Sequence, residues 1–490
     1  MNRAAQYQQL RQQNGELAQT VQRQEQRIEE LEQQVLQLEA QLAAATKSSV
    51  NSSKPPSSDL VKPKGSGKRG ARKIGGQPGH ARHERPAFTP EQIDQRKLYG
   101  LDACPDCGSR DLDPLPEPGR VVQQAELVLK PFVVTEHVAQ KCRCLKCHAV
   151  HEAKLPEAVT RTGLIGPRFL ALLLFVKGAL HVSYSGLQEL LDQALGLRVC
   201  RGFLAKVMTH KGVAALAAPV EELRGLLPTQ AHLNVDETSH RENKQLMWTW
   251  CFRARTFVVF SIQSSRGTRV LIDLLGVEFA GVLGCDYFSS YRKFMGLMNG
   301  TIQFCLAHLI RDLKFLAEHP DAATQRYAQP LLKAVGRLFA LIHQQVERPE
   351  LDFQKRLERQ KRRMIQWATD TSVISPIPWY VSKHCPQVAN MAQRFRKHGE
   401  AYFTFLTTPE IAPTNNLAEQ AIRFVVIDRH VTQGTRGPVG RIFCESIWTI
   451  IGTCRLQGRS IFQFLCQAVD AWSNDRTPPS LVPVLSIDSS

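Results

Sequence analysis

Apolar side chains recur in heptads over the first 46 residues. The apolar residues are Val21, Ile28, Val35 and Leu42 at position a and Leu10, Leu17, Leu31 and Leu38 at position d. Two polar residues, Asn14 at position a and Gln24 at position d, interrupt the repeat. β-Branched a residues over Leu d residues favour a parallel two-stranded coil. One amphipathic helix packed on its own chain is the alternative, but the stripe is no wider than a coiled-coil seam. We predict that residues 1–46 form a leucine-zipper-like coiled coil through which the protein forms a homo-oligomer.

Residues 157–228 carry apolar positions at helical spacing. The periodicity predicts helices over Gly166–Leu180, Ser185–Ala194 and Arg201–Leu227, with a turn around Gly196. Short helices joined by a turn fit a helix-turn-helix DNA reader, and they fit a packed helical bundle equally well. We assign 157–228 as a helical DNA-binding region, with the bundle as the open alternative.

The pattern changes to strands at His232. It predicts strands over 232–235, 246–253, 256–263, 281–285 and 301–305, with a helix over 268–275 and another from Ala307. Asp236 ends the first strand and Asp286 follows the fourth. This order is that of the RNase H-like fold, in which the first and fourth strands lie side by side. Two neighbouring carboxylates repel unless they share a cation, and oxygen ligands suit magnesium or manganese.

A third acid is expected from a later helix. Asn416, Glu419 and Arg423 follow Pro413 at spacings of three and four, which places them on one helix face. Asn416 as N-cap with Glu419 would also make a capping box that needs no chemistry. Competing acids are Glu400, Glu410 and Glu445; we favour Glu419 because its helix start is well signalled.

Charge and composition add a basic arm. The chain of 490 residues has 62 Lys and Arg against 45 Asp and Glu, a net charge of +17, which favours a polyanionic partner such as nucleic acid. Residues 47–98 read as a basic flexible linker, and the positive charge around Lys68, Arg69, Arg72 and Lys73 suits contact with DNA phosphates. A plain solvated linker is the alternative.

Two Cys-x-x-Cys pairs follow the linker. Cys104 and Cys107 make the first pair and Cys144 and Cys147 the second, within a segment at 99–152 that we interpret as a zinc-ribbon-like module. The intervening sequence alternates as two strands would, over Val121–Lys130 and Phe132–Gln140. Cys142 and His148 are substitute ligands, and unrelated thiol pairs are the alternative to zinc.

No apolar run reaches the length of a membrane span, and the N-terminus has no signal-peptide pattern, so we expect a cytoplasmic protein without membrane contact. With the segments above, the fold class expected is multidomain α+β. Its parts are the coil, the zinc-ribbon-like module, an RNase H-like mixed α/β core at 229–317 and 406–475, a helical insertion at 318–405 and a tail at 476–490.

The chain resembles the transposases of insertion-sequence family 66, which are DDE-type enzymes. The coil and both cysteine pairs match, as do these further motifs: Ser52-Ser-Lys-Pro-Pro-Ser-Ser-Asp59, Gly75-Gly-Gln-Pro-Gly-His80, Val235-Asp-Glu-Thr238, Cys305-Leu-Ala-His308-Leu-Ile-Arg311, Asn415-Asn-Leu-Ala-Glu419 and Ile427-Asp-Arg-His430. They occur in the family's order and span nearly the whole chain.

The resemblance implies a DNA transposase that cleaves element ends and transfers 3′-hydroxyl strands into target DNA. It implies that Asp236, Asp286 and Glu419 bind two magnesium (or manganese) ions. It also implies DNA contacts at His308, Arg311, Arg423 and Arg429, accessory proteins of the same element as partners, and location at the bacterial nucleoid. A non-catalytic DNA-binding regulator and an RNase H-like nuclease without strand transfer are the alternatives.

Overall fold

The structure is a computed structural model that describes residues 3–45, 87–99, 101–113, 121–125, 127–128, 131–348 and 352–482. The protein is a mixed α/β chain that divides into two compact units, Lys64–Val138 and the remainder, Met1–Pro63 with Ala139–Ser490. The predicted DNA-contacting residues Lys68, Arg69, Arg72 and Lys73 lie outside the described residues.

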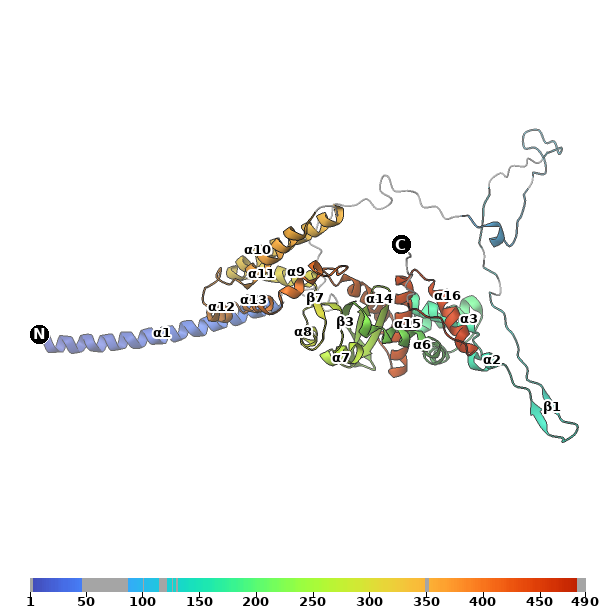
Figure 1. Ribbon diagram of the computed structural model, residues 1–490, viewed down its shortest axis with the longest axis horizontal. Coiled ribbons are helices and arrows are strands. Elements are labelled where there is room, and N and C mark those ends of the chain that lie inside the picture. Colours follow the sequence, from blue (N-terminus) through green and yellow to red (C-terminus); the bar gives the residue numbers. More distant parts are fainter. Residues whose placement is uncertain are drawn as a thin grey trace. The chain divides into compact units, whose positions relative to one another are not determined.

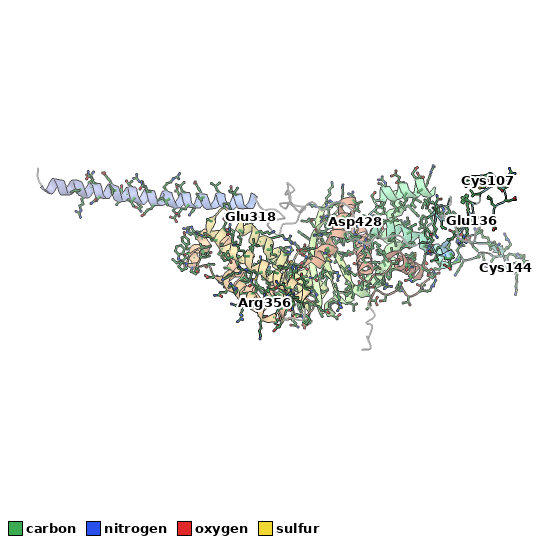
Figure 2. All side chains as sticks on the ribbon, turned by 90° about the horizontal axis from the view of Figure 1, so that it is seen from above. Cys107, Glu136, Cys144, Glu318, Arg356 and Asp428 are labelled. Carbon is green, nitrogen blue, oxygen red and sulfur yellow. The ribbon has the colours of Figure 1, made fainter. Side chains whose placement is uncertain are left out.

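The heptad segment forms one long helix, α1 (Arg3–Ala45). The predicted a and d side chains are between 44% and 67% exposed along it. Figure 2 shows side chains projecting from the helix over most of its length. Most of the seam is therefore open within a single chain, whereas Ile28, Leu31 and Val35 line a pocket with residues of the helical insertion.

The core holds a five-stranded sheet in the order β5-β4-β3-β6-β7 (Figure 1). The strands are β3 (His232–Glu242), β4 (Gln245–Arg253), β5 (Val258–Gln263), β6 (Val282–Cys285) and β7 (Thr301–Phe304). β4 runs antiparallel to β3 and β5, whereas β6 runs parallel to β3 and β7. Every residue of β6 is buried, as expected for a strand covered on both faces. The predicted first and fourth strands, β3 and β6, are thus neighbours.

The first strand is longer than predicted. The sequence suggested an end at Asp236, but β3 continues to Glu242, which pairs with Gln245 of β4. Asn243 and Lys244 make the connection with φ of +45° and +70°, the backbone of a tight two-residue hairpin turn. Asp236 consequently lies inside a paired strand, where its backbone is fixed on one side by β4.

Helices cover the sheet and its edge. α14 (Asn416–Thr432) packs on β3 and β4, and α15 (Pro438–Leu456) packs on β5 (Figure 1). Side chains on one face of α15 also accept hydrogen bonds from backbone N–H groups of this edge strand. The hydroxyls of Thr453 and Thr449 accept from two N–H groups of β5, at 3.2 and 3.0 Å. Such pairing protects an edge strand from association with another sheet. Beyond α15 lie α3 (Pro167–Ala179), α6 (Val213–Gly225) and α16 (Ile461–Ser473).

The helices predicted over 157–228 form close to their expected bounds. They are α2 (Glu157–Thr162), α3, α4 (Tyr184–Glu189), α5 (Arg201–Lys206) and α6, with π-helical turns η3 (Leu190–Ala194) and η4 (Val207–Gly212) and the 3-10 turn η5 (Leu227–Thr229). Glu157–Ala179 has the length and hydropathy of a membrane-spanning helix. However, α3 packs against α16, and its Lys177 forms a buried ion pair with Asp428 of α14 at 3.6 Å. These are the contacts of a core helix.

The remaining helices flank the sheet or follow β7. α7 (Thr268–Leu275) connects β5 to β6, and α8 (Ser289–Met295) connects β6 to β7. The predicted helical insertion contains α10 (Ala322–Glu347), α11 (Gln354–Thr369), α12 (Pro378–His384) and α13 (Pro386–His398), preceded by α9 (Leu306–Ala317) and followed by the short turns η6 (Glu400–Tyr402) and η7 (Thr404–Leu406). η6 and η7 pack on β7, so the insertion leaves from and returns to one end of the sheet.

The predicted strands between the cysteine pairs are absent from the described residues of Val121–Lys130 and Phe132–Gln140. The strands found nearby are β1 (Lys141–Arg143) and β2 (Val150–Glu152), which form a two-stranded hairpin around the second pair; a short 3-10 turn, η2 (Pro90–Gln92), lies upstream. Val121 and Val133 are 69% and 89% exposed. Alternation alone was misleading because these apolar residues have no layer to pack against.

Candidate active site

Strand register brings Asp236 and Asp286 to one level of the sheet. Asn234 of β3 is in register with Gly284 of β6, and each aspartate lies two residues further along its parallel strand direction. Asp286 directly follows the end of β6 and accepts a hydrogen bond from the N–H of Phe288 at 2.9 Å. Both carboxylates therefore come from the same edge of two adjacent strands.

The start of α14 is attached to β3 by a buried asparagine. The Asn415 side chain donates to the carbonyl of Val235 and accepts from the Asn234 amide, both at 2.8 Å. The Asn415 N–H is bonded to Cys305 Sγ, at 3.1 Å, on the other side. These bonds fix α14 beside the strand that carries Asp236.

Glu419 lies in the first turn of this helix, half-buried. The capping-box interpretation is wrong: the N-cap residue is Asn415 and not Asn416, and no side chain caps the helix start. The side-chain oxygen of Asn415, which a cap would need as acceptor, instead accepts a hydrogen bond from the Asn234 amide of β3. Glu419 is thus left with its carboxylate directed to other partners.

The charges of Asp286 and Glu419 both act on the buried carboxylate of Asp236. Burial raises the pKa of Asp236 well above its ordinary value, and the charges of Glu237, Asp286 and Glu419 raise it further. Burial also raises the pKa of Asp286, although the Phe288 N–H and the nearby Arg266 guanidinium oppose the effect. Crowded carboxylates of this kind are stabilised by a shared cation, and their oxygen atoms are the ligands that magnesium and manganese prefer. The three acids therefore have the donor type that such an ion prefers, but among the described residues their ligand atoms are not a group that all lie within 4.8 Å of one another.

A fourth acid, Glu237, was not singled out from the sequence. Its carboxylate pairs with Arg266 at 2.6 Å and accepts a hydrogen bond from the Tyr291 hydroxyl. Burial, with the charge of Asp286, raises the pKa of Glu237 to about 7. It lies next to Asp236 in the Val235–Thr238 motif, but nothing in the sequence indicated that Arg266 and Tyr291 would be its partners.

The competing acids are engaged elsewhere. Glu400 pairs with Lys361 at 2.7 Å, and Glu410 pairs with Arg255 at 3.0 Å. Glu445 is buried on α15, where it accepts the N–H of Ile262 and continues the row of acceptors along β5. Only Glu419 of these four acids contributes to the raised pKa of Asp236.

Comparison with known proteins identifies the family of the region that contains these acids. Residues 162–440, more than half of the chain and containing all three acids, match the transposase IS66 family. The chain belongs to this family. Residues 2–86 match a family of unknown function, DUF6444. A protein of Sinorhizobium fredii (strain NBRC 101917 / NGR234) described as "Uncharacterized protein y4hP" is 25% identical over 414 residues, which cover 75% of this chain and 70% of that protein. The chain is therefore a DNA transposase in the general sense of its family.

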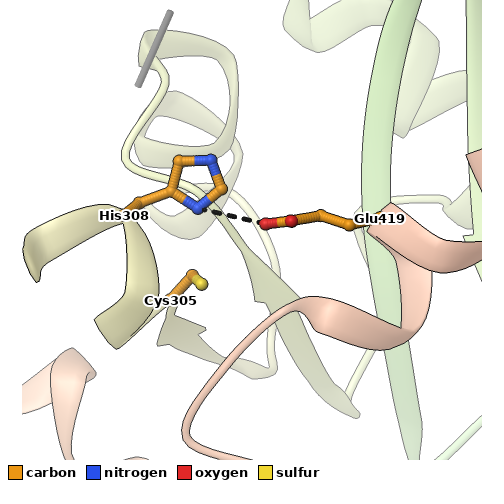
Figure 3. Close-up of side chains that lie close together, drawn as sticks. All are labelled: Cys305, His308 and Glu419. Carbon is orange, nitrogen blue, oxygen red and sulfur yellow. Dashed lines mark ion pairs between the residues drawn. The ribbon is translucent and has the colours of Figure 1, made fainter. Parts of the chain in front are cut away.

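In this IS66-family transposase, Glu419 faces His308 of α9 and Cys305, the residue before α9 (Figure 3), and it also pairs with Arg311 of α9. His308 Nδ1 lies 3.5 Å and the Arg311 guanidinium 3.3 Å from Glu419 Oε1. Cys305 Sγ, an imidazole nitrogen of His308 and a Glu419 oxygen all lie within 4.8 Å of one another. Burial, with the charge of Arg311, lowers the pKa of His308 to about 4, so the imidazole is neutral near pH 7. The sequence predicted His308 and Arg311 as DNA contacts, and the structure places both against Glu419.

The two other predicted DNA contacts on α14 differ from each other. Arg423 is exposed. Arg429 donates to the Thr238 hydroxyl at 3.1 Å and to the backbone carbonyl of Ser239, so it holds α14 on β3. Arg423 is therefore accessible to a partner at the surface, whereas the guanidinium of Arg429 is used to bind α14 to β3.

The two cysteine pairs of the transposase form matching turns. The N–H of Cys104 donates to Ser109 and that of Cys144 to Ala149, both at 2.8 Å. The fifth residue of each turn has positive φ, +74° at Gly108 and +60° at His148. In each turn, backbone N–H groups hydrogen-bonded to the first thiol lower its pKa. Lowered thiol pKa values favour the thiolate that binds metal.

Proposed function

We propose that this transposase cleaves DNA at the ends of its element and joins the resulting 3′-hydroxyl ends to target DNA in a reaction that depends on magnesium or manganese. The observation that carries the proposal is that Asp236 and Asp286 lie at one level of two adjacent parallel strands, while Asn415 ties the helix that carries Glu419 to the strand that carries Asp236. The charges of Asp286 and Glu419 disfavour an ionised Asp236, and a shared cation would relieve this repulsion.

The proposed catalytic core is RNase H-like. The support is the strand order β5-β4-β3-β6-β7, in which a three-stranded antiparallel meander is extended by two parallel strands. Each acid then has a rigid mount: β4 pairs with β3 before and after Asp236, β6 ends directly before Asp286, and Asn415 ties the helix of Glu419 to β3.

The chain's own residues set the charge and position of the site. Divalent magnesium or manganese held by Asp236, Asp286 and Glu419 would supply Lewis-acid stabilisation of phosphodiester oxygens. Arg266 pairs with Glu237 at 2.6 Å, and its charge opposes the rise that burial causes in the pKa of Asp286. Arg311 orients the Glu419 carboxylate. The neutral His308 is not a proton donor near pH 7 because its pKa is about 4.

Two accessory assignments accompany this proposal. We infer that Cys104, Cys107, Cys144 and Cys147 bind one structural zinc. Each pair by itself forms the same turn, in which backbone N–H groups lower the pKa of the first thiol. We also infer that α1 joins two copies of the chain through its exposed heptad seam, since a seam of Leu, Ile and Val needs a partner helix to become buried.

The experiment is a cleavage and joining assay with the full chain and DNA that carries the ends of its element. The wild type should cleave and join with magnesium, and Asp236→Asn should bind the DNA but do neither. Asp273→Asn, an exposed acid of α7 paired with Arg269, is the matched control and should remain active. DNA binding without metal-dependent cleavage in the wild type would identify a regulator. Cleavage without joining would identify a nuclease.

A further inference from the structure

The cluster of Cys305, His308 and Glu419 has donors that magnesium does not use. Magnesium takes oxygen ligands, whereas thiolate and imidazole select zinc and other softer divalent cations. All three donors come from well-fixed positions: Cys305 precedes α9, His308 lies in its first turn, and Glu419 lies in the first turn of α14 (Figure 3). The spacing Cys-x-x-His puts the first two donors on one face of α9.

The distances suit a zinc ion after a small closure. Zinc bonds of about 2.0–2.3 Å at tetrahedral angles place ligand atoms roughly 3.3–3.8 Å apart. His308 Nδ1 and Glu419 Oε1 already lie 3.5 Å apart. The sulfur completes a group whose members are all within 4.8 Å of one another, so at most about 1.5 Å of closure brings it to zinc-ligand spacing.

Arg311 now provides the positive charge at this cluster. Its guanidinium lies 3.3 Å from Glu419 Oε1 and 3.1 Å from His308 Nε2. A metal ion and the guanidinium would compete for the same two partners. Because the long side chain of Arg311 is partly exposed, its guanidinium can turn toward solvent when an ion enters.

We propose that Cys305, His308 and Glu419 form a second cation site, selective for zinc over magnesium, whose occupation removes Glu419 from Asp236 and Asp286 and so inhibits the transposase. The binding half of the proposal stands on the cluster alone, and the inhibition half rests on the proposed function. The site has three protein ligands and one position open to water, as expected for an exchangeable zinc ion.

Cobalt titration of the zinc-loaded full chain tests the binding half. Wild-type protein should take up one further Co²⁺ per chain, with thiolate-to-cobalt charge-transfer absorption that Cys305→Ser removes. Affinity should fall about tenfold or more in His308→Gln. Cys200→Ser is the matched control, because Cys200 also precedes a helix and accepts a backbone N–H, at 3.4 Å, but has an exposed side chain. Arg311→Met should bind Co²⁺ more tightly than wild type, a gain that misfolding would not produce.

Identical Co²⁺ stoichiometry and absorption in the wild type and Cys305→Ser would overturn the site. For the inhibition half, Zn²⁺ should suppress magnesium-dependent cleavage by the wild type at concentrations about tenfold below those needed for Cys305→Ser. Equal sensitivity to Zn²⁺ in both proteins would overturn inhibition through Glu419. A protein that never cleaves DNA but shows the cobalt difference would remove the proposed function and leave the site standing.

Discussion

Asn415 donates its side-chain amide to the carbonyl of Val235 at 2.8 Å, and this bond joins the helix that carries Glu419 to the strand that carries Asp236. The same side chain accepts the amide of Asn234 at 2.8 Å. Asn415 is 1% exposed, so neither partner could turn to water if the asparagine were lost. The relative position of two proposed metal-binding carboxylates therefore depends on one residue that binds no metal.

We predict that Asn415→Ala lowers metal-dependent DNA cleavage more than it lowers DNA binding. Loss of the two buried bonds should also reduce the free energy of unfolding by about 1–3 kcal/mol. Asn416→Ala is the matched control, because Asn416 is the next residue and is exposed. Chemical denaturation and cleavage assays measure the two effects. Equal cleavage by the two variants would show that Asn415 does not position Glu419.

Some of this arrangement could be predicted from the sequence because it depends on local pattern. The strands, the position of Asp286 after β6 and the helix that carries Glu419 follow from runs of buried apolar residues and from their ends. The bond from Asn415 to Val235 could not be predicted, since it joins residues 180 positions apart. The capping box considered for Asn416 was wrong because capping rules use only residues near the helix start. They do not take into account that a residue of a distant strand, Asn234, can bond to the side chain at the N-cap position.

The same distinction applies elsewhere. β3 extends beyond Asp236 because β4 pairs with it, although the residues from Ser239 to Glu242 are polar and look like a loop. Conversely, the valines near Val133 alternate like a strand but remain exposed. In both cases the deciding contact is with a partner element and lies outside the segment itself.

The buried imidazole of His240 should make the folded protein sensitive to acid. It is 1% exposed, its Nε2 lies 3.1 Å from the Thr435 hydroxyl, and burial lowers its pKa to about 4. In the unfolded chain the His240 imidazole takes up a proton near pH 6.5, whereas in the folded chain it stays neutral down to about pH 4. The free energy of unfolding should therefore fall as the pH decreases from about 6.5 to 4, by at most about 3 kcal/mol.

We therefore expect His240→Gln to flatten the fall in unfolding free energy between pH 7 and about pH 4.5, measured by denaturant titration. Glutamine retains a partner for Thr435 but does not titrate. His343→Gln, on the exposed side of α10, should keep the wild-type slope. A slope unchanged in His240→Gln would mean that this imidazole is protonated alike in folded and unfolded chains.

The coil prediction concerns α1. Sedimentation of the full chain should give a dimer, and Ile28→Glu with Leu31→Glu should give a monomer, because the charges would face each other in the seam. Gln26→Glu with Gln33→Glu adds the same charge on the outer face of the helix and should leave the dimer intact. A monomeric wild type, or a dimer that survives the seam substitutions, would contradict self-association through α1.

The zinc prediction concerns the cysteine turns. Elemental analysis should find about one zinc per chain fewer in Cys144→Ser than in the wild type, as expected for a closed four-thiolate site. Cys200→Ser should retain the wild-type content, since Cys200 lies at the start of α5. Full zinc content in Cys144→Ser would instead point to Cys142 or His148 as ligands.

The most direct test of the account asks whether Glu419 completes the carboxylate site. Glu419→Gln preserves shape and removes charge; Glu410→Gln and Glu445→Gln do the same at an acid paired with Arg255 and at one bonded to the edge strand β5. With magnesium and element-end DNA, Glu419→Gln should bind the DNA but show cleavage and joining at least about 100-fold below wild type, as for loss of transition-state stabilisation of about 3 kcal/mol. Glu410→Gln should cleave at the wild-type rate, and Glu445→Gln should keep its activity while losing stability. Cleavage that survives in Glu419→Gln and disappears in a folded Glu445→Gln or Glu410→Gln would contradict the account.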